Sequence, residues 1–432
     1  MSSNKNALLV SFFFPPNKAV GSLRPAYLAQ YLPAYGWDVT VLSARVPGGT
    51  RPSWASVLET DYTDVVAQTK RMMGLAPSQS TYAVLGEHAP SAGHQNSMSL
   101  RQLVILNGWR LVTYPDAMRG WYRHLVSELN KTVANQKFDA IISTSPPVTT
   151  HLAVRRANRR FIPWIADLRD LWADNPYHQG RLRRSLDAIL ESRTLSAAAA
   201  LVTVSDPLAQ VLQRRFPSKP TWSIPNAFDA REWETIPFKA PEKCELVYAG
   251  QMRDPSILFQ ALLEEVKAGA ITSNNFSLNL FTEPTSWLLG EIERFSLEPF
   301  VHIRGVVERS EVMRAERNST ANIVISSFRK GEEAGYTAKL FEYLGARRPI
   351  IGIGPNRSVI GELLAKIAGC WYASNVEQAR LAVRGALHNW ETDANTTIPF
   401  SQIEQFSAEH LASRFARVLE QVTSPEPTRR RQ

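Results

Sequence analysis

A lysine and a glutamate, Lys339 and Glu342, lie three residues apart in the segment GYTAKLFEYLGARRPIIGIG, residues 335–354. This segment is typical of a helix with an apolar face, followed by a turn and a buried strand that ends in glycines. On such a helix the two charged side chains share one face. An ammonium and a carboxylate at neighbouring depths could bind the phosphates and the ribose of one nucleoside diphosphate. The alternative is a solvated ion pair, which contributes only a few tenths of a kcal/mol.

The start of this helix and one earlier loop supply further candidate phosphate ligands. The helix follows the strand-like run Ala321–Ser326 through a polar loop, so its first backbone N–H groups, next to Thr337, suit an anion. Arg253 follows another strand-like run, Glu245–Ala249. Its guanidinium could bind a diphosphate through two hydrogen bonds. A solvated loop arginine is the alternative for Arg253.

A glycine near the start of the chain is a further candidate for ligand contact. The string PPNKAVGSLRP lies between the first predicted strand and a helix that begins near Ser22. Gly21 would let the backbone approach a ligand closely, and the helix N-terminus would favour an anion. An ordinary strand–helix turn is the alternative.

Two side chains of the first half are candidates for catalysis. Asp170, in the string WIADLRDLW, could orient or deprotonate an acceptor hydroxyl. A structural ion pair between Arg169 and its flanking aspartates is the alternative. His151, which follows the string SPP at the start of a predicted helix, is the second candidate. A lone histidine is more often a capping or packing residue.

These residues must be positioned by the elements around them, and short apolar runs alternate with helix-length segments along the chain. The runs of the first half are Ala7–Phe14, Asp38–Leu42, Asp139–Thr144, Pro163–Ala166, Ala200–Val204 and Trp222–Ile224. Those of the second half are Glu245–Ala249, Phe276–Phe281, Val301–Gly305, Ala321–Ser326, Pro349–Ile353 and Cys370–Ala373. Continuous apolarity favours strands buried on both faces of a parallel sheet. We therefore expect an α/β fold with two doubly wound, Rossmann-like domains facing a central cleft, with ligands at the carboxyl ends of the strands.

The pattern of runs restarts once, and the restart sets the predicted domain bounds. The predicted divisions are a first domain at 1–228, a linker at 229–242, a second domain at 243–405, a C-terminal helix at 406–422 and a disordered basic tail at 423–432. A polar insertion at about 51–117 interrupts the first domain, and we interpret it as an insertion with a functional role. The C-terminal helix is expected to pack back on the first domain.

Composition and the absence of certain motifs indicate which partners and cofactors to expect. The chain has 432 residues and a net charge of +9, which favours an anionic partner. No apolar run reaches about 18 residues and no secretory pattern opens the chain, so we expect a cytoplasmic protein. An Asp-x-Asp metal motif, a Walker loop and a complete GxGxxG string are all missing, so we expect no metal ion and no cofactor. The βα layout argues against a nucleic-acid partner.

Five segments, in this order, resemble the family 4-like retaining glycosyltransferases of the GT-B fold. They are LLVSFFFPPNKAVGSLRPAYLAQYLPAYGWDVTVLS, FDAIISTSPPVTTHLA with PWIADLRDLW, LVTVSDPLAQVLQRRF with SIPNAFD, LVYAGQMRDPSILFQAL, and YTAKLFEYLGARRPIIGIG. The resemblance covers the chain except residues 51–110. It implies that Glu342 is the ribose-binding glutamate. The earlier glutamate that the family often carries eight residues before is Ala334 here, with Glu332 and Glu333 adjacent.

The resemblance also implies an activity. Arg253, Lys339 and helix-end N–H groups would stabilise charge on a departing diphosphate without a metal. The expected reaction is transfer of a sugar, with retention, from a nucleotide-diphosphate-sugar to a glycan or lipid-linked acceptor. Cell-surface polysaccharide or glycolipid synthesis is the expected setting. Two alternatives stay open: a non-hydrolysing sugar-nucleotide epimerase, and a non-catalytic nucleotide-sugar-binding relative.

An anionic membrane surface, on the inner face of the membrane, is a further candidate partner. Basic residues gather in the first half at Arg155, Arg156, Arg159, Arg160, Arg181, Arg183, Arg184, Arg214 and Arg215. The string WRLVTYPDAMRGWYRHLV adds Trp109, Trp121 and Tyr122, interleaved with Arg110, Arg119 and Arg123. Such a composition suits a lipid interface. The alternative is that the arginines lie on solvated helix faces and the aromatic residues lie in the core.

Overall fold

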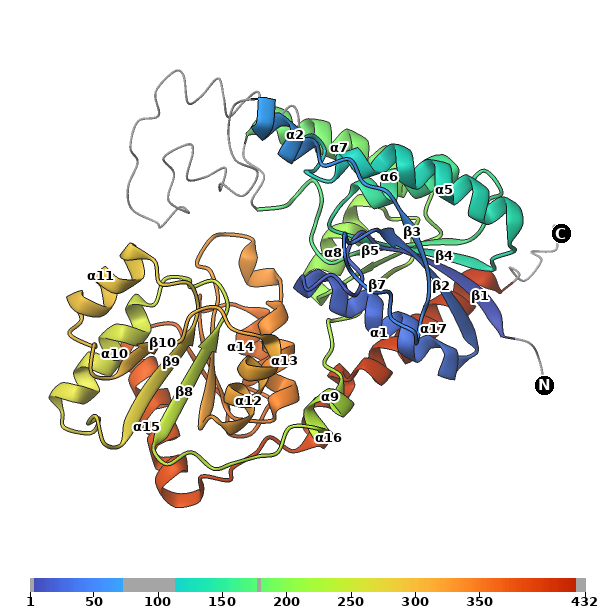
Figure 1. Ribbon diagram of the computed structural model, residues 1–432. Coiled ribbons are helices and arrows are strands. Elements are labelled where there is room, and N and C mark those ends of the chain that lie inside the picture. The colour runs from blue at the N-terminus through green and yellow to red at the C-terminus, as the bar shows by residue number, and fades with distance from the viewer. Residues whose placement is uncertain (1–3, 73–112, 177–179, 425–432) are drawn as a thin grey trace. The chain divides into compact units, whose positions relative to one another are not determined.

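The chain folds into two compact units, each built on a parallel sheet (Figure 1). The computed structural model describes residues 4–72, 113–176 and 180–424. The first unit contains the chain up to Ser223 and again from Ala412, and the second unit spans Ile224–Leu411. Both units alternate strand and helix, as the apolar runs predict.

The first sheet has seven parallel strands in the order β3-β2-β1-β4-β5-β6-β7. Their bounds are β1 Lys5–Val10, β2 Trp37–Ala44, β3 Ser56–Thr60, β4 Ala140–Ser145, β5 Trp164–Leu168, β6 Ala200–Thr203 and β7 Thr221–Ser223. Leu9 of β1 lies opposite Val41 of β2 and Ile142 of β4, so β1 lies inside the sheet between these two strands. Each run predicted in the first half contributes a strand. The strand β3 is an addition, because it lies inside the segment interpreted as an insertion.

Helices cover both faces of this sheet (Figure 1). Their bounds are α1 Leu23–Tyr31, α2 Val65–Met72, α5 Tyr122–Asn135, α6 Thr149–Ala157, α7 Arg181–Leu195 and α8 Asp206–Arg215. Short 3-10 turns stand at η1 Val20–Ser22, η2 Leu32–Tyr35 and η3 Arg119–Trp121. The helices α5, α6 and α7 lie together on one face.

The second sheet has six parallel strands in the order β10-β9-β8-β11-β12-β13. Their bounds are β8 Cys244–Ala249, β9 Phe276–Phe281, β10 Val301–Ile303, β11 Ala321–Ile325, β12 Ile350–Ile353 and β13 Trp371–Ala373. Every run predicted in the second half is therefore confirmed as a strand. The strand β8 lies inside this sheet. On one side of it lie β9 and β10, and on the other side lie β11, β12 and β13.

The helices of the second unit pack on two apolar cores. Their bounds are α9 Ala230–Glu234, α10 Ser256–Lys267, α11 Ser286–Arg294, α12 Arg309–Asn318, α13 Ala338–Ala346, α14 Val359–Leu364, α15 Val376–Asp393 and α16 Phe400–Ile403, with 3-10 turns at η4 Glu332–Ala334 and η5 Glu404–Phe406. One core joins α10, α11 and α15 to the sheet around Phe259 and Phe276. The other joins α9, α13 and α14 around Trp233 and Phe341.

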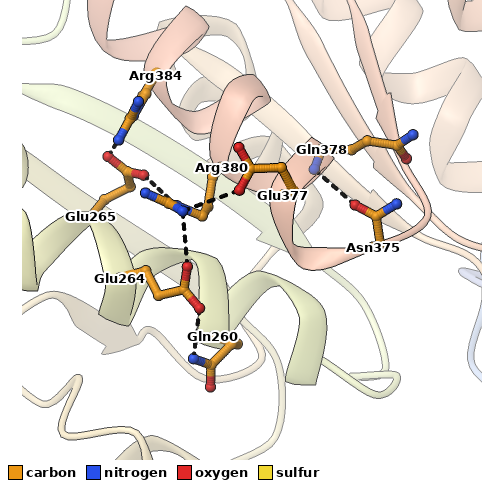
Figure 2. Close-up of polar contacts among 8 residues, drawn as sticks. All are labelled: Gln260, Glu264, Glu265, Asn375, Glu377, Gln378, Arg380 and Arg384. Carbon is orange, nitrogen blue, oxygen red and sulfur yellow. Dashed lines mark hydrogen bonds and ion pairs between the residues drawn. The ribbon is translucent and has the colours of Figure 1, made fainter.

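A buried glutamate ties two helices of the first of these cores together. Glu265 of α10 accepts a hydrogen bond at 2.8 Å from each of Arg380 and Arg384 of α15 (Figure 2). Arg380 also contacts Glu264 and Glu377 at 3.1 Å. Because both carboxylate oxygens of Glu265 accept hydrogen bonds from guanidinium groups, these contacts offset the desolvation cost of burying it.

The chain returns to the first unit through its last helix, α17 Ala408–Thr423. Phe415 is buried against the guanidinium of Arg24, 5.1 Å from the ring centroid, and Lys5 Nζ lies 3.3 Å from Thr423 Oγ1. The unit boundary falls after Ser223, so the predicted linker 229–242 lies within the second unit and contains α9. Within the described residues, no helix is long and apolar enough to cross a membrane.

Candidate functional site

The second sheet reverses its strand order between β8 and β11, and the candidate phosphate ligands gather at that point. In doubly wound folds, ligands bind at the carboxyl ends of the strands where the order reverses. Gly250 follows β8 with φ of +116°, a conformation that favours glycine. Arg253 lies three residues further on, and α13 follows β11 after η4. The structure thus brings the predicted Arg253, Thr337, Lys339 and Glu342 to one edge of one sheet.

Two contacts fix α13 at this edge. The hydroxyl of Tyr343 accepts a hydrogen bond from the backbone N–H of Ala249, 3.0 Å away at the end of β8. On another side of the helix, a Cβ at Gly345 would lie 2.2 Å from Nε1 of Trp233, so only glycine admits the indole of α9. The first contact sets the helix against the strand end, and the second sets its distance from α9.

Lys339 and Glu342 form a close ion pair on the face that α13 turns toward Gly250 and α12. Lys339 Nζ lies 2.8 Å from Glu342 Oε2, and Arg309 Nε of α12 lies 3.5 Å from Glu342 Oε1. A Cβ at Gly250 would lie 3.6 Å from Cε of Lys339, so the lysine stem runs beside the end of β8. The predicted pairing of Lys339 and Glu342 is present, but both side chains are largely buried, so a solvated surface pair is wrong.

A third acidic residue, Glu316 of α12, lies behind this pair. Its Oε1 is 3.8 Å from Lys339 Nζ, and the side chain is fully buried. Burial and the nearby Glu342 carboxylate raise the pKa of Glu316 to about 8. Burial alone would lower the pKa of Lys339, but Glu342 and Glu316 raise it above its ordinary value. Sequence reasoning missed Glu316, because the segment RSEVMRAERN is strongly polar and resembles a solvated helix.

Arg253 and Thr337 border the same edge. Arg253 Nη1 donates to Glu332 Oε2 at 2.8 Å, so one of the two acids beside Ala334 holds the predicted phosphate ligand. Thr337 is the N-cap residue of α13, and its hydroxyl is buried with no hydrogen-bond partner among the described residues. Their roles in phosphate binding stay predictions.

In the first unit, Gly21 lies against a half-buried arginine, Arg169, just beyond the end of β5. Arg169 donates to three carbonyl oxygens, those of Ser145 at 3.0 Å, Gly21 at 2.8 Å and Pro146 at 2.9 Å. A Cβ at Gly21 would lie 3.0 Å from Arg169 Nη1. The close neighbour of Gly21 in this structure is therefore Arg169, and its contact with a ligand stays a prediction.

The two aspartates that flank Arg169 have different surroundings. Asp167 is fully buried and accepts two hydrogen bonds from Arg24 and one from Thr144, at 2.8–3.0 Å. It belongs to a structural ion pair with Arg24, and not with the adjacent Arg169 that the alternative interpretation named. Asp170 is exposed just beyond the end of β5. Its exposure suits contact with an acceptor hydroxyl, and its catalytic role stays a prediction.

His151 lies in the first turn of α6 and is fully buried. Its Nδ1 is 2.7 Å from Ser143 Oγ, which also accepts from Trp164 Nε1 at 2.7 Å. Burial is the main cause that lowers the pKa of His151 to about 4, so the ring is neutral. This environment fits a packing residue and lends no support to the catalytic assignment.

Solved structures with a similar fold align with almost the whole chain. Sucrose-phosphate synthase from Thermosynechococcus elongatus is 12% identical, with a TM-score of 0.55, over 97% of this chain and 99% of its own. The N-terminal domain of Candida albicans trehalose-6-phosphate phosphatase is 11% identical, with a TM-score of 0.64, over 98% of each chain. Pneumococcal O-GlcNAc transferase GtfA, in complex with UDP and GlcNAc, is 9% identical, with a TM-score of 0.56, over 98% and 100%.

One sequence comparison finds a similar family in the first half of the chain. No curated protein sequence matches the chain. Residues 23–227 match the family model described as a glycosyl transferase 4-like domain. This match supports sugar transfer as the class of activity, and the solved structures above share the fold. Residues 23–227 are therefore similar to glycosyl transferase 4-like domains, in a chain with the GT-B fold of two Rossmann-like domains.

Proposed function

We propose that the protein transfers a sugar, with retention, from a nucleotide-diphosphate-sugar to the hydroxyl of a glycan or lipid-linked acceptor. The observation that carries the proposal is the Lys339–Glu342 pair beside Gly250, at the point where the strand order of the second sheet reverses. Glu342 would accept hydrogen bonds from the ribose hydroxyls. Lys339 and the backbone N–H groups at the start of α13 would stabilise the departing diphosphate.

Metal independence is part of the proposal. A phosphate leaving group needs its developing charge balanced, and Lys339 and Arg253 supply cations on the same edge of the sheet. Within the described residues, no group of three or more His, Cys, Asp or Glu side chains is arranged to hold a metal ion. Undiminished turnover in EDTA supports this part, and activity restored only by magnesium or manganese contradicts it.

The ribose contact is tested by Glu342→Ala. Loss of hydrogen bonds to a charged group should weaken nucleoside diphosphate binding by about 1.5–3 kcal/mol. Calorimetry with UDP, GDP and ADP would first identify the base, UDP being the ligand of the pneumococcal structure. Glu293→Ala, at an exposed position of α11, is the matched control and should bind normally. Unchanged affinity in folded Glu342→Ala would reject the assignment.

The two alternatives differ from this proposal in their products. An epimerase would convert the nucleotide-sugar without an acceptor, and a non-catalytic relative would bind the donor without turnover. Proton NMR of fresh product, with and without acceptor, separates the three. A new glycosidic bond with inverted configuration would refute retention.

An anionic membrane surface is proposed as the site where the acceptor is met, in glycolipid or cell-surface polysaccharide synthesis. On α7, Leu182, Leu186 and Ile189 are exposed at helical spacing, by 75%, 45% and 52%. Phe161, after α6, is 90% exposed. Of the basic residues predicted at this surface, those exposed on or near α6, α7 and α8 are Arg155, Arg156, Arg159, Arg160, Arg181, Arg184 and Arg214. Exposed apolar and basic groups together are typical of an interfacial helix.

Several residues expected at this surface lie elsewhere. Trp121 is fully buried and donates to Thr60 Oγ1 at 2.5 Å, so it is a core residue. Arg183 and Arg215 form ion pairs with Asp187 and Glu191. Trp109 and Arg110 lie outside the described residues. The apolar part of the surface therefore comes from α7 and Phe161, which the sequence pattern did not single out.

Liposome flotation tests the membrane proposal. Each basic residue near an anionic surface contributes about 1 kcal/mol, so binding should occur at low salt and weaken as salt rises. The double change Leu182→Ser and Ile189→Ser should reduce binding, whereas Leu381→Ser, on an equally exposed site of α15, should not. Failure of the wild type to float with anionic vesicles at low salt would favour an acceptor in solution.

A further inference from the structure

Glu316 is a fully buried carboxyl that the reaction described above does not use. It lies on α12, and neither of its carboxylate oxygens has a hydrogen-bond partner among the described residues. An ionised carboxylate in such a place is costly, because no N–H or O–H group replaces the water that it loses. A residue of this kind holds a proton unless a neighbouring cation offsets the cost.

The groups around Glu316 come from three elements. From α13, Lys339 Nζ lies 3.8 Å away and Glu342 lies beyond it, with Tyr343 on the same helix. From α12 itself, Arg309 also acts on Glu316. From α9, Glu232 holds Arg309 through two contacts of 3.1 Å and 2.9 Å. Arg309 is therefore largely balanced by Glu232, and two carboxylates, Glu316 and Glu342, share the one ammonium of Lys339.

The protonation state of Glu316 decides how much of the charge of Lys339 remains for a ligand. When Glu316 is neutral, the positive charge of Lys339 is balanced by the carboxylate of Glu342 alone. With Glu316 ionised, a second negative charge acts on Lys339 within 4 Å and would repel any anion bound beside it. Burial and the like charge of Glu342 both favour the neutral form near neutral pH.

We infer that Glu316 is a positioning residue that acts through Lys339, and that binding of the donor diphosphate is coupled to protonation of Glu316. The inference rests on the proposed donor site. The diphosphate brings negative charge to Lys339, and it binds the state in which Glu316 carries a proton. A protein whose Glu316 is ionised must take up one proton from solvent for each ligand bound.

The coupling predicts a specific pH dependence. If only the protonated form is competent, the apparent dissociation constant rises as the fraction of that form falls. With half-protonation at about pH 8, the constant for the nucleoside diphosphate that the wild type binds should rise about tenfold between pH 7 and pH 9. The change should appear in KM and leave kcat nearly constant, because the diphosphate contact is made before transfer.

Calorimetry on the whole protein tests the coupling. At pH 8, wild type should take up a proton in part, seen as a binding enthalpy that depends on the ionisation enthalpy of the buffer. Glu316→Gln, which mimics the neutral acid, should bind within about twofold of wild type at pH 7, without proton uptake and without the tenfold loss by pH 9. Glu265→Gln, a change at another buried glutamate of the same unit, should keep the wild-type pH dependence. Wild-type binding that is flat from pH 7 to 9, or an unchanged slope in Glu316→Gln, would overturn the inference.

A measurement without nucleotide separates this inference from the proposed function. A carboxyl whose pKa is raised in the folded state contributes stability that is present below its unfolded pKa and lost as pH rises to the folded value. The stability of wild type relative to Glu316→Gln should therefore fall from pH 5 to pH 8 in urea unfolding. A gap that stays constant with pH would refute the titration of Glu316. If the stability difference between wild type and Glu316→Gln changes with pH as expected, but wild type binds no nucleotide, then the donor site is rejected and the titration of Glu316 is not.

Discussion

The imidazole of His151 is neutral in the folded protein because burial outweighs the favourable charge of Asp167. Its pKa is lowered to about 4, whereas an unfolded histidine titrates near 6.5. The unfolded chain therefore binds more protons between these values, so stability is present above about pH 6.5 and is lost as pH falls toward 4. The shift corresponds to about 3 kcal/mol.

Urea unfolding at pH 7, 5 and 4 checks this contribution. Wild type should lose about 3 kcal/mol more than His151→Gln over this range. If wild type and His151→Gln lose the same free energy of unfolding, then a residue other than His151 causes the acid sensitivity.

Residue types and spacing predicted the Lys339–Glu342 pair but not the depth of the side chains. The distance of three residues sets a shared helix face whatever the helix packs against. Burial depends on the neighbours of the helix, so the solvated alternative for this pair and the lipid-facing interpretation of Trp121 could be tested only in three dimensions. Glu316 carried no sequence signal, because α12 is polar almost throughout.

Between elements, the closest constraint on the candidate site is the packing of α13 on α9. Gly345→Ala would place a methyl group inside the contact distance of Trp233. We expect destabilisation by about 1–3 kcal/mol, the usual cost of overpacking, together with weaker nucleotide binding, because α9 also carries Glu232 and α13 carries Glu342.

Chemical unfolding of matched glycine variants measures this constraint. Gly290, in α11, has open space around its Cβ position, so Gly290→Ala should stabilise the protein by up to about 1 kcal/mol. Opposite signs for the two changes are the expected result. A stabilising Gly345→Ala would mean that α9 moves freely relative to α13.

Sequence patterns predicted strands better than they predicted the segments between them. Continuous apolar runs such as Phe276–Phe281 have few structures available other than a buried parallel strand. The edge strand β3 was missed because Ser56–Thr60 mixes polar and apolar residues, as an edge that is only half-covered permits. The segment predicted as a linker, 229–242, is polar in composition but contains the five-residue helix α9 with the buried Trp233.

At the level of the whole chain, the second unit is inserted between two parts of the first. Phe415 of α17 is fully buried in the first unit, so Phe415→Ala should cost about 3–5 kcal/mol there. Hydrogen exchange should accelerate in β1 and α1 and change little in β8 and β9. Arg417→Ala, at an exposed position of the same helix, is the control. Equal acceleration in both units would show that they unfold as one cooperative body.

The contact between Lys5 and Thr423 has a topological consequence. Because the first strand and the last helix of the described chain meet side by side, a short peptide could join them, and the chain could be reopened at an exposed loop. Such a circular permutant would keep every strand neighbour, and the second unit could then be expressed at one end. The strands would then follow one another in a different order along the chain but keep the same neighbours in the sheet.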